Sequence, residues 1–365
     1  MRVALVHDWL NQSGGAEDVL AALAGMFPAA PIYTSIYAPE RVSAAFRERD
    51  VRVSWADRLP GIHRQQQRYL LAFPFAFRGF DLSGYDIILS NKSGFCHGVR
   101  KPSGVKHICY CLTPTRYVWD LPGYLEQERF HPALPTLMRP LMGWLQRWDR
   151  SAADGIDHFV AISSAVQRRI ALFYGRDSVI IIHPPVDTAR FRPSEQKGDY
   201  FLVVSRLIPY KRIDLAVQAC TQLNLRLIVA GDGRDRARLE ALAGPTVQFV
   251  GRVPEADLPD LMARCRAFIF PGREDFGIAP VQAMASGRPV TAFAAGGALD
   301  YVQAGRTGVL FEEQSLRSLA EALHGFADDA FDASEIREEA MRFDRGVFES
   351  RLRGFIETVW NSANT

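Results

Sequence analysis

Two basic side chains in the second half of the 365-residue chain have the type and spacing needed to bind a diphosphate. The apolar run Phe201–Val204 is followed by Arg206, and Lys211 comes five residues after Arg206. A strand over this run would place both cations near its carboxyl end, where the next helix begins. A guanidinium can hold phosphate oxygens in a bidentate manner, and an ammonium adds a point charge. Solvated surface charge is the alternative interpretation for each residue taken alone.

The stretch after the apolar residues 268–270 combines a carboxylate with the start of a helix. Glu274 lies in the expected loop and, as an acceptor when ionised, suits sugar hydroxyls. Pro280 fits the first position of a helix that ends at residues 287–289. Gln282, further along this helix, has the chemistry to pair with vicinal hydroxyls. The backbone amides in front of the helix would face a ligand with the helix dipole behind them; they belong to Phe276, Gly277 and Ile278.

A glycine pair follows the first expected strand at the other end of the chain. Gly14 and Gly15 precede a stretch with helical apolar periodicity. They would let backbone N–H groups approach an anion at a helix N-terminus. The pair is not the G-x-G-x-x-G pattern of dinucleotide-binding proteins, and a plain turn is the alternative.

Short β-branched runs alternate with helical stretches along the chain, which is typical of parallel sheets covered by helices. The expected strands are residues 3–7, 32–34, 51–54, 86–90, 107–111, 159–162 and 179–183, then 201–204, 225–230, 247–250, 267–270, 290–293 and 309–311. Residues 183–198 are rich in proline and polar side chains and indicate a domain boundary. We predict two doubly wound α/β domains facing each other across a cleft, with ligands at the carboxyl ends of the strands.

Composition and charge exclude several classes of protein. With 48% hydrophobic and 23% charged residues the chain is no disordered segment, and its length suits two domains of about 150 residues. The near balance of 43 basic and 41 acidic residues argues against a dedicated nucleic-acid binder. Residues 1–150 hold 18 basic and 13 acidic side chains, a net charge of +5. The first domain therefore suits something anionic, with scattered surface charge as the alternative.

The cysteines and the N-terminus predict a reduced, cytoplasmic protein. The sequence has five cysteines without a CxxC pair, and no apolar run long enough to span a membrane. The first eight residues already include charge, which is unlike a signal peptide. Zinc ligation is one interpretation of the cluster of Cys96, His97, His107, Cys109 and Cys111. We favour the other, in which residues 106–111 form a strand and Cys109 and Cys111 share one face of it as small core side chains.

The order of motifs in the second half resembles the retaining family 4 glycosyltransferases of the GT-B fold. These motifs are S-R-L-x3-K-R from residue 205, G-D-G from 231, G-R-V-P from 251 and E-D-F-G-I-A-P-V-Q-A-M-A-S-G-R-P-V from 274. Residues 184–187 resemble the interdomain link of that family, and the helix expected at 343–360 resembles the one that crosses back. The resemblance implies an N-terminal acceptor-side domain of residues 1–190 and 345–365, and a donor-binding domain of residues 191–344.

The resemblance also implies roles for the residues singled out above. Arg206 and Lys211 would bind the donor diphosphate in place of a metal ion, and Glu274 would contact the donor sugar. The amides of residues 276–278 would bind sugar and phosphate, and Gly14 with Gly15 would pack against the pyrophosphate. Two further residues, Arg252 and Val253, would flank the base. No metal and no cofactor are implied, only a nucleotide sugar as substrate.

Two positions depart from the family pattern. Position 282 is Gln where the family's E-x7-E pattern has Glu, which removes charge assistance from a hydrogen bond to the ribose and leaves a non-catalytic relative as an alternative. Leu112 stands where many relatives carry a His that contacts the donor sugar near its O6. An apolar side chain there favours a 6-deoxyhexose donor. The alternative is that Leu112 only packs beneath the cleft while Arg116 or Asp8 reaches the sugar.

Basic and large apolar residues interleave over residues 62–80 and 129–150, which is typical of a surface that lies on an anionic membrane or packs against the domain core. The leading hypothesis is a metal-independent, retaining hexosyltransferase that uses GDP-mannose, by similarity to bacterial polysaccharide mannosyltransferases. Its acceptor would be a saccharide or a polyprenyl-diphosphate-linked lipid in surface-polysaccharide or lipopolysaccharide synthesis at the inner face of the cell membrane. The alternatives are an epimerase, a phosphorylase and a nucleotide-sugar-binding scaffold.

Overall fold

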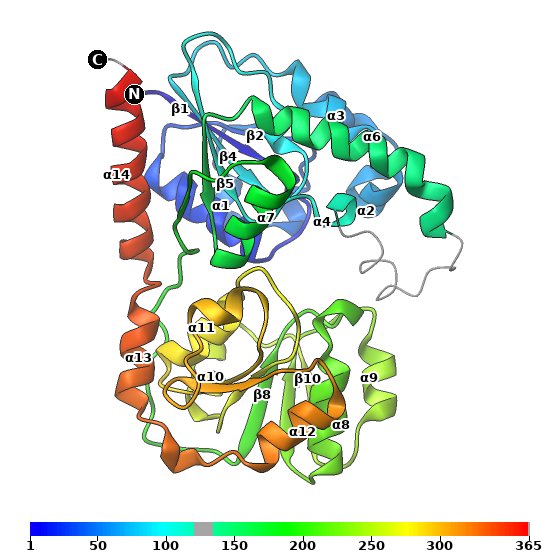
Figure 1. The fold of residues 1–365 in the computed structure, drawn as a ribbon, viewed down its shortest axis with the longest axis vertical. Helices are drawn as coiled ribbons and strands as arrows, with labels where there is room; N and C mark the ends of the chain where they lie inside the picture. Colours follow the sequence, from blue (N-terminus) through cyan, green and yellow to red (C-terminus); the bar gives the residue numbers. More distant parts are fainter. Residues whose placement is uncertain (120–133, 364–365) are drawn as a thin grey trace. The chain divides into compact units, whose positions relative to one another are not determined.

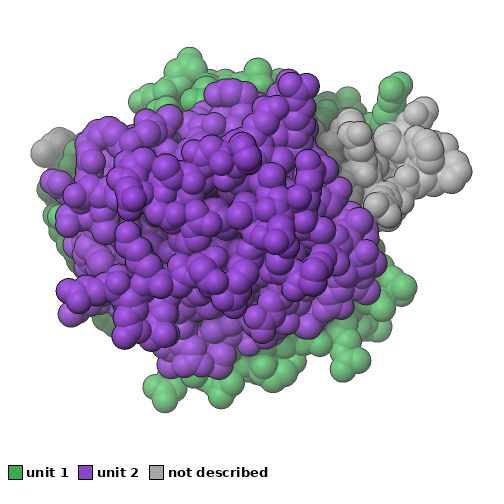
Figure 2. Space-filling model, turned by 90° about the horizontal axis from the view of Figure 1, so that it is seen from below, with its two compact units in different colours: residues 1–183, 348–365 green, residues 184–347 purple. Residues whose placement is uncertain are grey.

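The computed structural model describes residues 1–119 and 134–363 and divides the chain into two compact units. Unit 1 comprises Met1–His183 and Phe348–Thr365, and unit 2 comprises Pro184–Val347 (Figure 1, Figure 2). Residues 129–133 of the interleaved basic and apolar stretch lie outside the described residues. None of the helices in the described ranges combines the length and the apolar character needed to cross a bilayer.

Unit 1 is built on a parallel sheet of seven strands in the order β3-β2-β1-β4-β5-β6-β7. The strands are β1 Val3–His7, β2 Ile32–Thr34, β3 Val51–Val53, β4 Ile87–Lys92, β5 Lys106–Cys111, β6 His158–Ala161 and β7 Val179–Ile181. The chain runs outward from β1 to β3 and then returns to β4 on the other side of β1, so the strand order reverses between β1 and β4. The helices are α1 Gly15–Met26, α2 Ile62–Gln65, α3 Phe73–Ala76, α4 Arg116–Trp119, α6 Leu134–Asp154, α7 Ser164–Tyr174 and α14 Arg345–Ala363.

Unit 2 repeats this topology with a parallel sheet of six strands in the order β10-β9-β8-β11-β12-β13. The strands are β8 Tyr200–Val204, β9 Arg226–Ala230, β10 Val247–Gly251, β11 Phe268–Phe270, β12 Val290–Phe293 and β13 Gly308–Phe311. The order reverses between β8 and β11. The helices are α8 Ile213–Gln222, α9 Arg236–Leu242, α10 Leu258–Arg264, α11 Ile278–Ala285, α12 Leu316–His324 and α13 Ala333–Met341.

The sheets form where the sequence has continuous apolar runs, because parallel strands covered by helices are buried on both faces. All five residues of β1 are buried, as are all three of β11. Every strand expected from the sequence is present within two residues of its predicted bounds. The predicted class, two doubly wound parallel sheets, is therefore confirmed.

The units divide at His183 and Pro184 rather than after residue 190. The reason is a short pairing of the connecting segment with the end of unit 2. The amide of Val186 donates to Phe343 O at 2.9 Å, and the amide of Arg345 donates to Val186 O at 3.0 Å. The hydroxyl of Thr188 donates to Asp344 Oδ2 at 2.6 Å.

The last helix returns the chain to unit 1, as the resemblance implied. From Phe348 onward α14 belongs to unit 1. The ring of Phe348 meets that of Tyr110 at 5.6 Å, and Arg351 donates to Ile181 O at 2.9 Å. The helix therefore covers the side of the sheet where β5 and β7 lie.

A buried polar cluster lies beneath the carboxyl end of β4. Lys92 and Asp149 are both fully buried, and the hydroxyl of Thr115 lies 3.1 Å from Lys92 Nζ and 2.9 Å from Asp149 Oδ1. Burial alone would raise the pKa of Asp149, but Lys92, His97 and the hydroxyl of Tyr174 outweigh burial and lower it. The charge pair is thus compensated by neighbours from several elements.

The histidines and cysteines of the expected zinc alternative are core side chains. All five cysteines are free and buried. Within residues 1–119 and 134–363, no three His, Cys, Asp or Glu side chains are grouped so as to hold a metal ion. Burial, followed by the positive charge of Lys92, lowers the pKa of His97 to about 4. Burial lowers the pKa of His107 to about 3, and its Nε2 lies 2.9 Å from Ser90 Oγ.

The lowered pKa values of these two histidines predict that the protein loses stability in mild acid. In an unfolded chain their pKa returns to about 6.5, so the unfolded state binds more protons below that pH, and stability falls as the pH is lowered from about 6.5 toward 4. For His107 alone we expect a loss of about 2 kcal/mol between pH 7.5 and pH 5. Urea unfolding of His107→Gln at both pH values should show a shallower pH dependence than the parent chain. The exposed His324→Gln is the matched control, and equal slopes in all three proteins would contradict the prediction.

Candidate active site

The predicted cations and the predicted carboxylate flank the point in unit 2 where the strand order reverses. Arg206 follows β8, and Lys211 ends the short 3-10 turn Pro209–Lys211 before α8. Glu274 follows β11, which pairs directly with β8 through Phe268 and Leu202. In open parallel sheets, ligands bind outside the carboxyl ends of the strands at such a reversal.

Lys211 and Glu274 form an ion pair with each other. The ammonium Nζ of Lys211 donates to Glu274 Oε2, and the two side chains are only 15% and 16% exposed. Lys211 Nζ also lies 5.7 Å from the centre of the Tyr210 ring. The sequence suggested separate roles for these residues and did not predict their pairing. Since the pair is sheltered from water, it holds the carboxylate in one position more firmly than a surface pair would.

Glycines in two loops hold the backbone of this pair. A Cβ on Gly272 would lie 2.9 Å from Lys211 O, and one on Gly296, which has φ +72°, would lie 2.1 Å from Glu274 O. The amide of Gly297 donates to Glu274 O at 2.9 Å. The loops after β8, β11 and β12 therefore interlock through close backbone contacts that only glycine allows.

Arg206 combines a fixed backbone with an available side chain. The loop 231–233 presses against its neighbours, because a Cβ on Gly231 would lie 1.8 Å from Ser205 O and one on Gly233 2.2 Å from Leu207 O. The amide of Leu207 donates to Asp232 O at 3.0 Å. Arg206 itself is exposed, and its guanidinium makes no hydrogen bond or ion pair with the part of the chain that the structure describes. It is thus available to bind an anion.

The N-terminus of α11 lies in the loop that carries Glu274. Gly277 is its N-cap, with φ +93°, and no side chain caps the helix. Phe276 is buried, and the hydroxyl of Tyr301 donates to Phe276 O at 2.8 Å. Burial, together with the nearby carboxylate of Glu274, raises the pKa of Tyr301 well above its usual range, so this hydroxyl keeps its proton. The amides ahead of Ile278 are thus oriented by a tyrosine that sequence reasoning missed, because no local pattern marks it.

The remaining donor-side residues lie at the same edge of the sheet. Gln282 is half-buried in the second turn of α11, and its side-chain amide makes no hydrogen bond with any described residue. Arg252 is exposed and Val253 is half-buried, directly after β10. Because β10 is separated from β8 by β9, these two residues lie further along the edge than Arg206.

In unit 1, Asp8 follows β1 at the corresponding reversal. Its carboxylate is fully buried and accepts from the amides of Ser93 and Gly94 at 2.6 Å and of Cys96 at 2.7 Å. A Cβ on Gly94 would meet Asp8 Oδ1 at 3.0 Å and the ring of Trp9 at 2.9 Å. The carboxylate that was one of two alternatives for reaching a sugar is therefore hydrogen-bonded to the loop after β4 and holds that loop.

The glycine pair of unit 1 lies at the start of α1 as expected, but a carboxylate sits beside it. Gly14 is the N-cap without a side-chain cap, and Gly15 is the first helical residue. Glu17 is buried, with Oε1 3.8 Å from His7 Nε2. A Cβ on Gly14 would lie 3.3 Å from Glu17 Oε2. Sequence reasoning missed Glu17. Its place in the first turn of an apolar helix could have marked it, because acidic residues are favoured at helix N-termini.

Leu112 and Arg116 lie in a loop held by the buried cluster. Leu112 is 8% exposed, and its amide donates to Lys92 O at 2.8 Å. Lys92 Nζ donates to Thr113 O at 3.3 Å. Arg116 is half-buried and begins α4. Leu112 thus comes directly after β5, and Arg116 follows four residues later at the start of α4.

Two family models match the chain. The model described as Glycosyltransferase Family 4 matches residues 13–190, and the model described as Glycosyl transferases group 1 matches residues 186–343. Together they span almost all of both units. The chain therefore belongs to the family 4 glycosyltransferases.

Among curated proteins, the chain is 30% identical over 225 residues to a GDP-mannose-dependent alpha-mannosyltransferase of Mycobacterium tuberculosis. It is 28% identical over 240 residues to D-inositol 3-phosphate glycosyltransferase 1 of Catenulispora acidiphila. In both cases the match covers 57% of this chain and 57% of the relative, so the chain spans little more than half the length of these relatives.

Solved structures share the fold over the whole chain. Anabaena Alr3699/HepE in complex with UDP superimposes with a TM-score of 0.70 at 20% identity, covering 98% of this chain and 100% of that one. Sucrose-phosphate synthase from Thermosynechococcus elongatus has a TM-score of 0.71 at 18% identity, with the same coverage. These neighbours confirm the predicted GT-B class of the fold.

Gly277→Ala tests the geometry of the α11 N-terminus. Its Cβ would lie 2.5 Å from Phe270 Cζ at a φ of +93°, so both the space and the backbone conformation oppose a side chain. We expect a loss of about 2–4 kcal/mol in the free energy of unfolding. Gly305→Ala is the matched control, because Gly305 has φ +78° with no atom within 4 Å, and should cost only about 1 kcal/mol. If urea unfolding showed equal losses of unfolding free energy for the two variants, the close contact at Gly277 would not contribute to stability.

Proposed function

We propose that this chain is a hexosyltransferase that takes its sugar from a nucleotide-sugar donor bound to unit 2. The observation that carries the proposal is the arrangement of the Lys211–Glu274 pair, the available guanidinium of Arg206 and the uncapped α11 N-terminus at one sheet reversal. Membership in the family 4 glycosyltransferases supports it. These groups match the parts of a nucleotide sugar, which are a diphosphate and a polyhydroxylated ring.

The proposed chemistry is electrostatic stabilisation of the leaving nucleotide. Arg206 would bind the diphosphate in a bidentate manner, and Lys211 would add a second positive charge next to it. These two cations would do the work that a metal ion does in other transferases. The α11 amides would stabilise charge that develops on the phosphate as the glycosidic bond breaks.

Glu274 would orient the donor sugar by accepting hydrogen bonds from its hydroxyls. Because Lys211 holds the carboxylate in place, the sugar would meet an acceptor that needs little reorganisation. A phosphate oxygen of the donor would take the acceptor's proton on the face that the nucleotide leaves. The transfer would then proceed with retention of configuration and without a nucleophile from the protein.

For the donor we propose a GDP-linked hexose, with mannose first, because a curated relative is named GDP-mannose-dependent. A GDP-linked 6-deoxyhexose is the second candidate, which the apolar and largely buried Leu112 favours. Gln282 would hydrogen-bond the ribose hydroxyls, with Arg252 and Val253 beside the base. Gly14 and Gly15 would approach the pyrophosphate from unit 1.

For the acceptor we propose a saccharide or a polyprenyl-diphosphate-linked lipid of bacterial surface-polysaccharide synthesis. The excess of basic residues in unit 1 and its basic and aromatic stretches support this proposal. Peripheral attachment to the inner face of the cell membrane would follow from such an acceptor.

Glu274→Gln and Arg206→Ala test whether the chain is an enzyme. Removing the carboxylate charge or the bidentate cation should each lower kcat/KM for donor turnover by about 100-fold or more. Arg206→Ala should leave the unfolding midpoint nearly unchanged because Arg206 is exposed, whereas Glu274→Gln should lower it, because Lys211 loses its sheltered partner. Glu338→Gln, an exposed change on α13, is the control and should leave turnover unchanged. A parent chain that binds nucleotide sugar but never turns it over would instead support the non-catalytic alternative.

A nucleotide panel tests the donor. We expect GDP to raise the melting temperature more than UDP or ADP, because the proposed donor carries guanosine. Initial rates with GDP-mannose and a GDP-6-deoxyhexose would then separate the two donor candidates. A clear preference for mannose excludes the 6-deoxyhexose, and the largest thermal shift with UDP would contradict both.

A further inference from the structure

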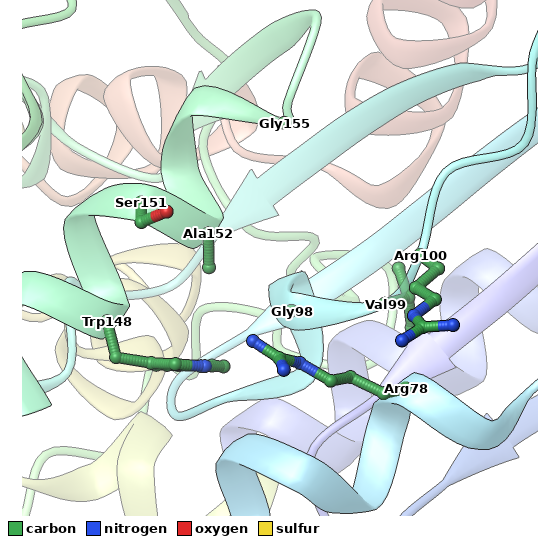
Figure 3. A pocket seen from close by; sticks show the side chains of 8 residues that line it. All are labelled: Arg78, Gly98, Val99, Arg100, Trp148, Ser151, Ala152 and Gly155. Carbon is green, nitrogen blue, oxygen red and sulfur yellow. The ribbon is translucent and has the colours of Figure 1, made fainter.

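A pocket of about 260 Å³ lies on unit 1, and none of the residues assigned to the donor lines it. It is lined by Arg78 from the 3-10 turn Phe77–Gly79, by residues 98–100, and by Trp148 and Ser151 of α6. Figure 3 shows the side chains of Arg78 and Trp148 extending toward each other, with Arg100 on the Arg78 side.

The charges of this pocket are of one sign. Arg78 and Arg100 are both exposed, and no Asp or Glu is among the lining residues. Neither guanidinium forms an ion pair with a residue in the described ranges 1–119 and 134–363. Two uncompensated guanidinium groups at one concave site favour an anion, and their planar donors match the oxygens of a phosphate. The hydroxyl of Ser151 adds a neutral donor.

One wall of the pocket is a fixed aromatic ring. Trp148 packs edge-on against Phe95 at 5.4 Å and against His97 at 5.6 Å. Gly98 makes room for it, because a Cβ there would lie 2.5 Å from Trp148 Cζ2. A phosphate joined to an apolar group fits this pocket, because the arginines bind the phosphate and the indole ring packs against the apolar group.

The pocket continues into an exposed aromatic surface. The guanidinium of Arg78 lies 5.6 Å from the centre of the Phe75 ring, and Phe75 stacks on Trp144 at 6.0 Å. Phe75 is 45% exposed, and Leu71, four residues earlier, is 47% exposed. Large exposed apolar side chains next to arginines are typical of surfaces at the boundary of an anionic bilayer.

We propose that this pocket binds the phosphate of an anionic phospholipid head group, with Phe75 and Trp144 entering the boundary of the bilayer. The contact of Arg78 with the exposed ring of Phe75 favours a lipid over a free phosphate. The net charge of +5 over residues 1–150 adds long-range attraction to such a surface. This inference rests on the membrane attachment proposed above and assigns it to particular residues, none of which is among those proposed to bind the donor.

Vesicle flotation of the full chain tests the proposal. We expect the protein to bind phosphatidylcholine vesicles that contain phosphatidylglycerol. The double variant Arg78→Glu with Arg100→Glu should bind these vesicles about tenfold more weakly. Arg47→Glu with Arg168→Glu is the matched control, because it makes the same charge change at exposed positions of unit 1 outside the pocket. Equal losses in the two double variants, or equal binding to vesicles of phosphatidylcholine alone, would overturn the proposal.

Two further arms identify the ligand. Arg78→Lys with Arg100→Lys keeps the charge but removes the bidentate donors, so it should still weaken flotation by several-fold. Inorganic phosphate at millimolar concentration should not displace the protein from vesicles; displacement would reassign the pocket to a soluble phosphate. Donor turnover with a soluble acceptor should be unchanged in all these variants, which separates failure of this site from failure of the proposed function.

Discussion

The ion pair between Lys211 and Glu274 constrains the rest of unit 2, because it joins opposite charges where the strand order reverses. A carboxylate close to a proposed diphosphate site would repel the ligand if it were unpaired. The lysine offsets this charge, and the exposed guanidinium of Arg206 adds a positive charge at the same edge of the sheet. The close contacts of the glycines around the pair keep the backbone of Lys211 at a fixed distance from that of Glu274.

The two units use the same topological position in different ways. In unit 2 the reversal presents charged side chains, whereas in unit 1 the carboxylate of Asp8 is saturated by three backbone amides of the loop after β4. A buried carboxylate with several amide donors is a structural anchor rather than a reactive group. The difference agrees with the proposed function, in which unit 2 would bind the donor, whereas the loops of unit 1 at this position are held by buried hydrogen bonds.

The strands and the order of the motifs could be predicted from the sequence, because buried parallel strands read as continuous apolar runs. Arg206, Lys211 and Glu274 were found because each follows such a run. The pairing of Lys211 with Glu274 was not predictable, since 63 residues separate them and only the β8–β11 adjacency joins them. The hydrogen bonds of Asp8 and Tyr301 were not predictable for a related reason, because their partners come from loops that are distant in sequence.

The glycine contacts of unit 2 have a consequence for how this protein can diversify. Gly231, Gly233 and Gly296 each leave room for the carbonyl of a neighbouring loop, so no side chain fits at these positions. Variation at this edge is thereby restricted to side chains that extend away from the packed backbones, such as Arg206 and Gln282. Redesign of ligand preference should therefore proceed by exchanging those side chains on an unchanged loop framework, and grafting of loops should fail.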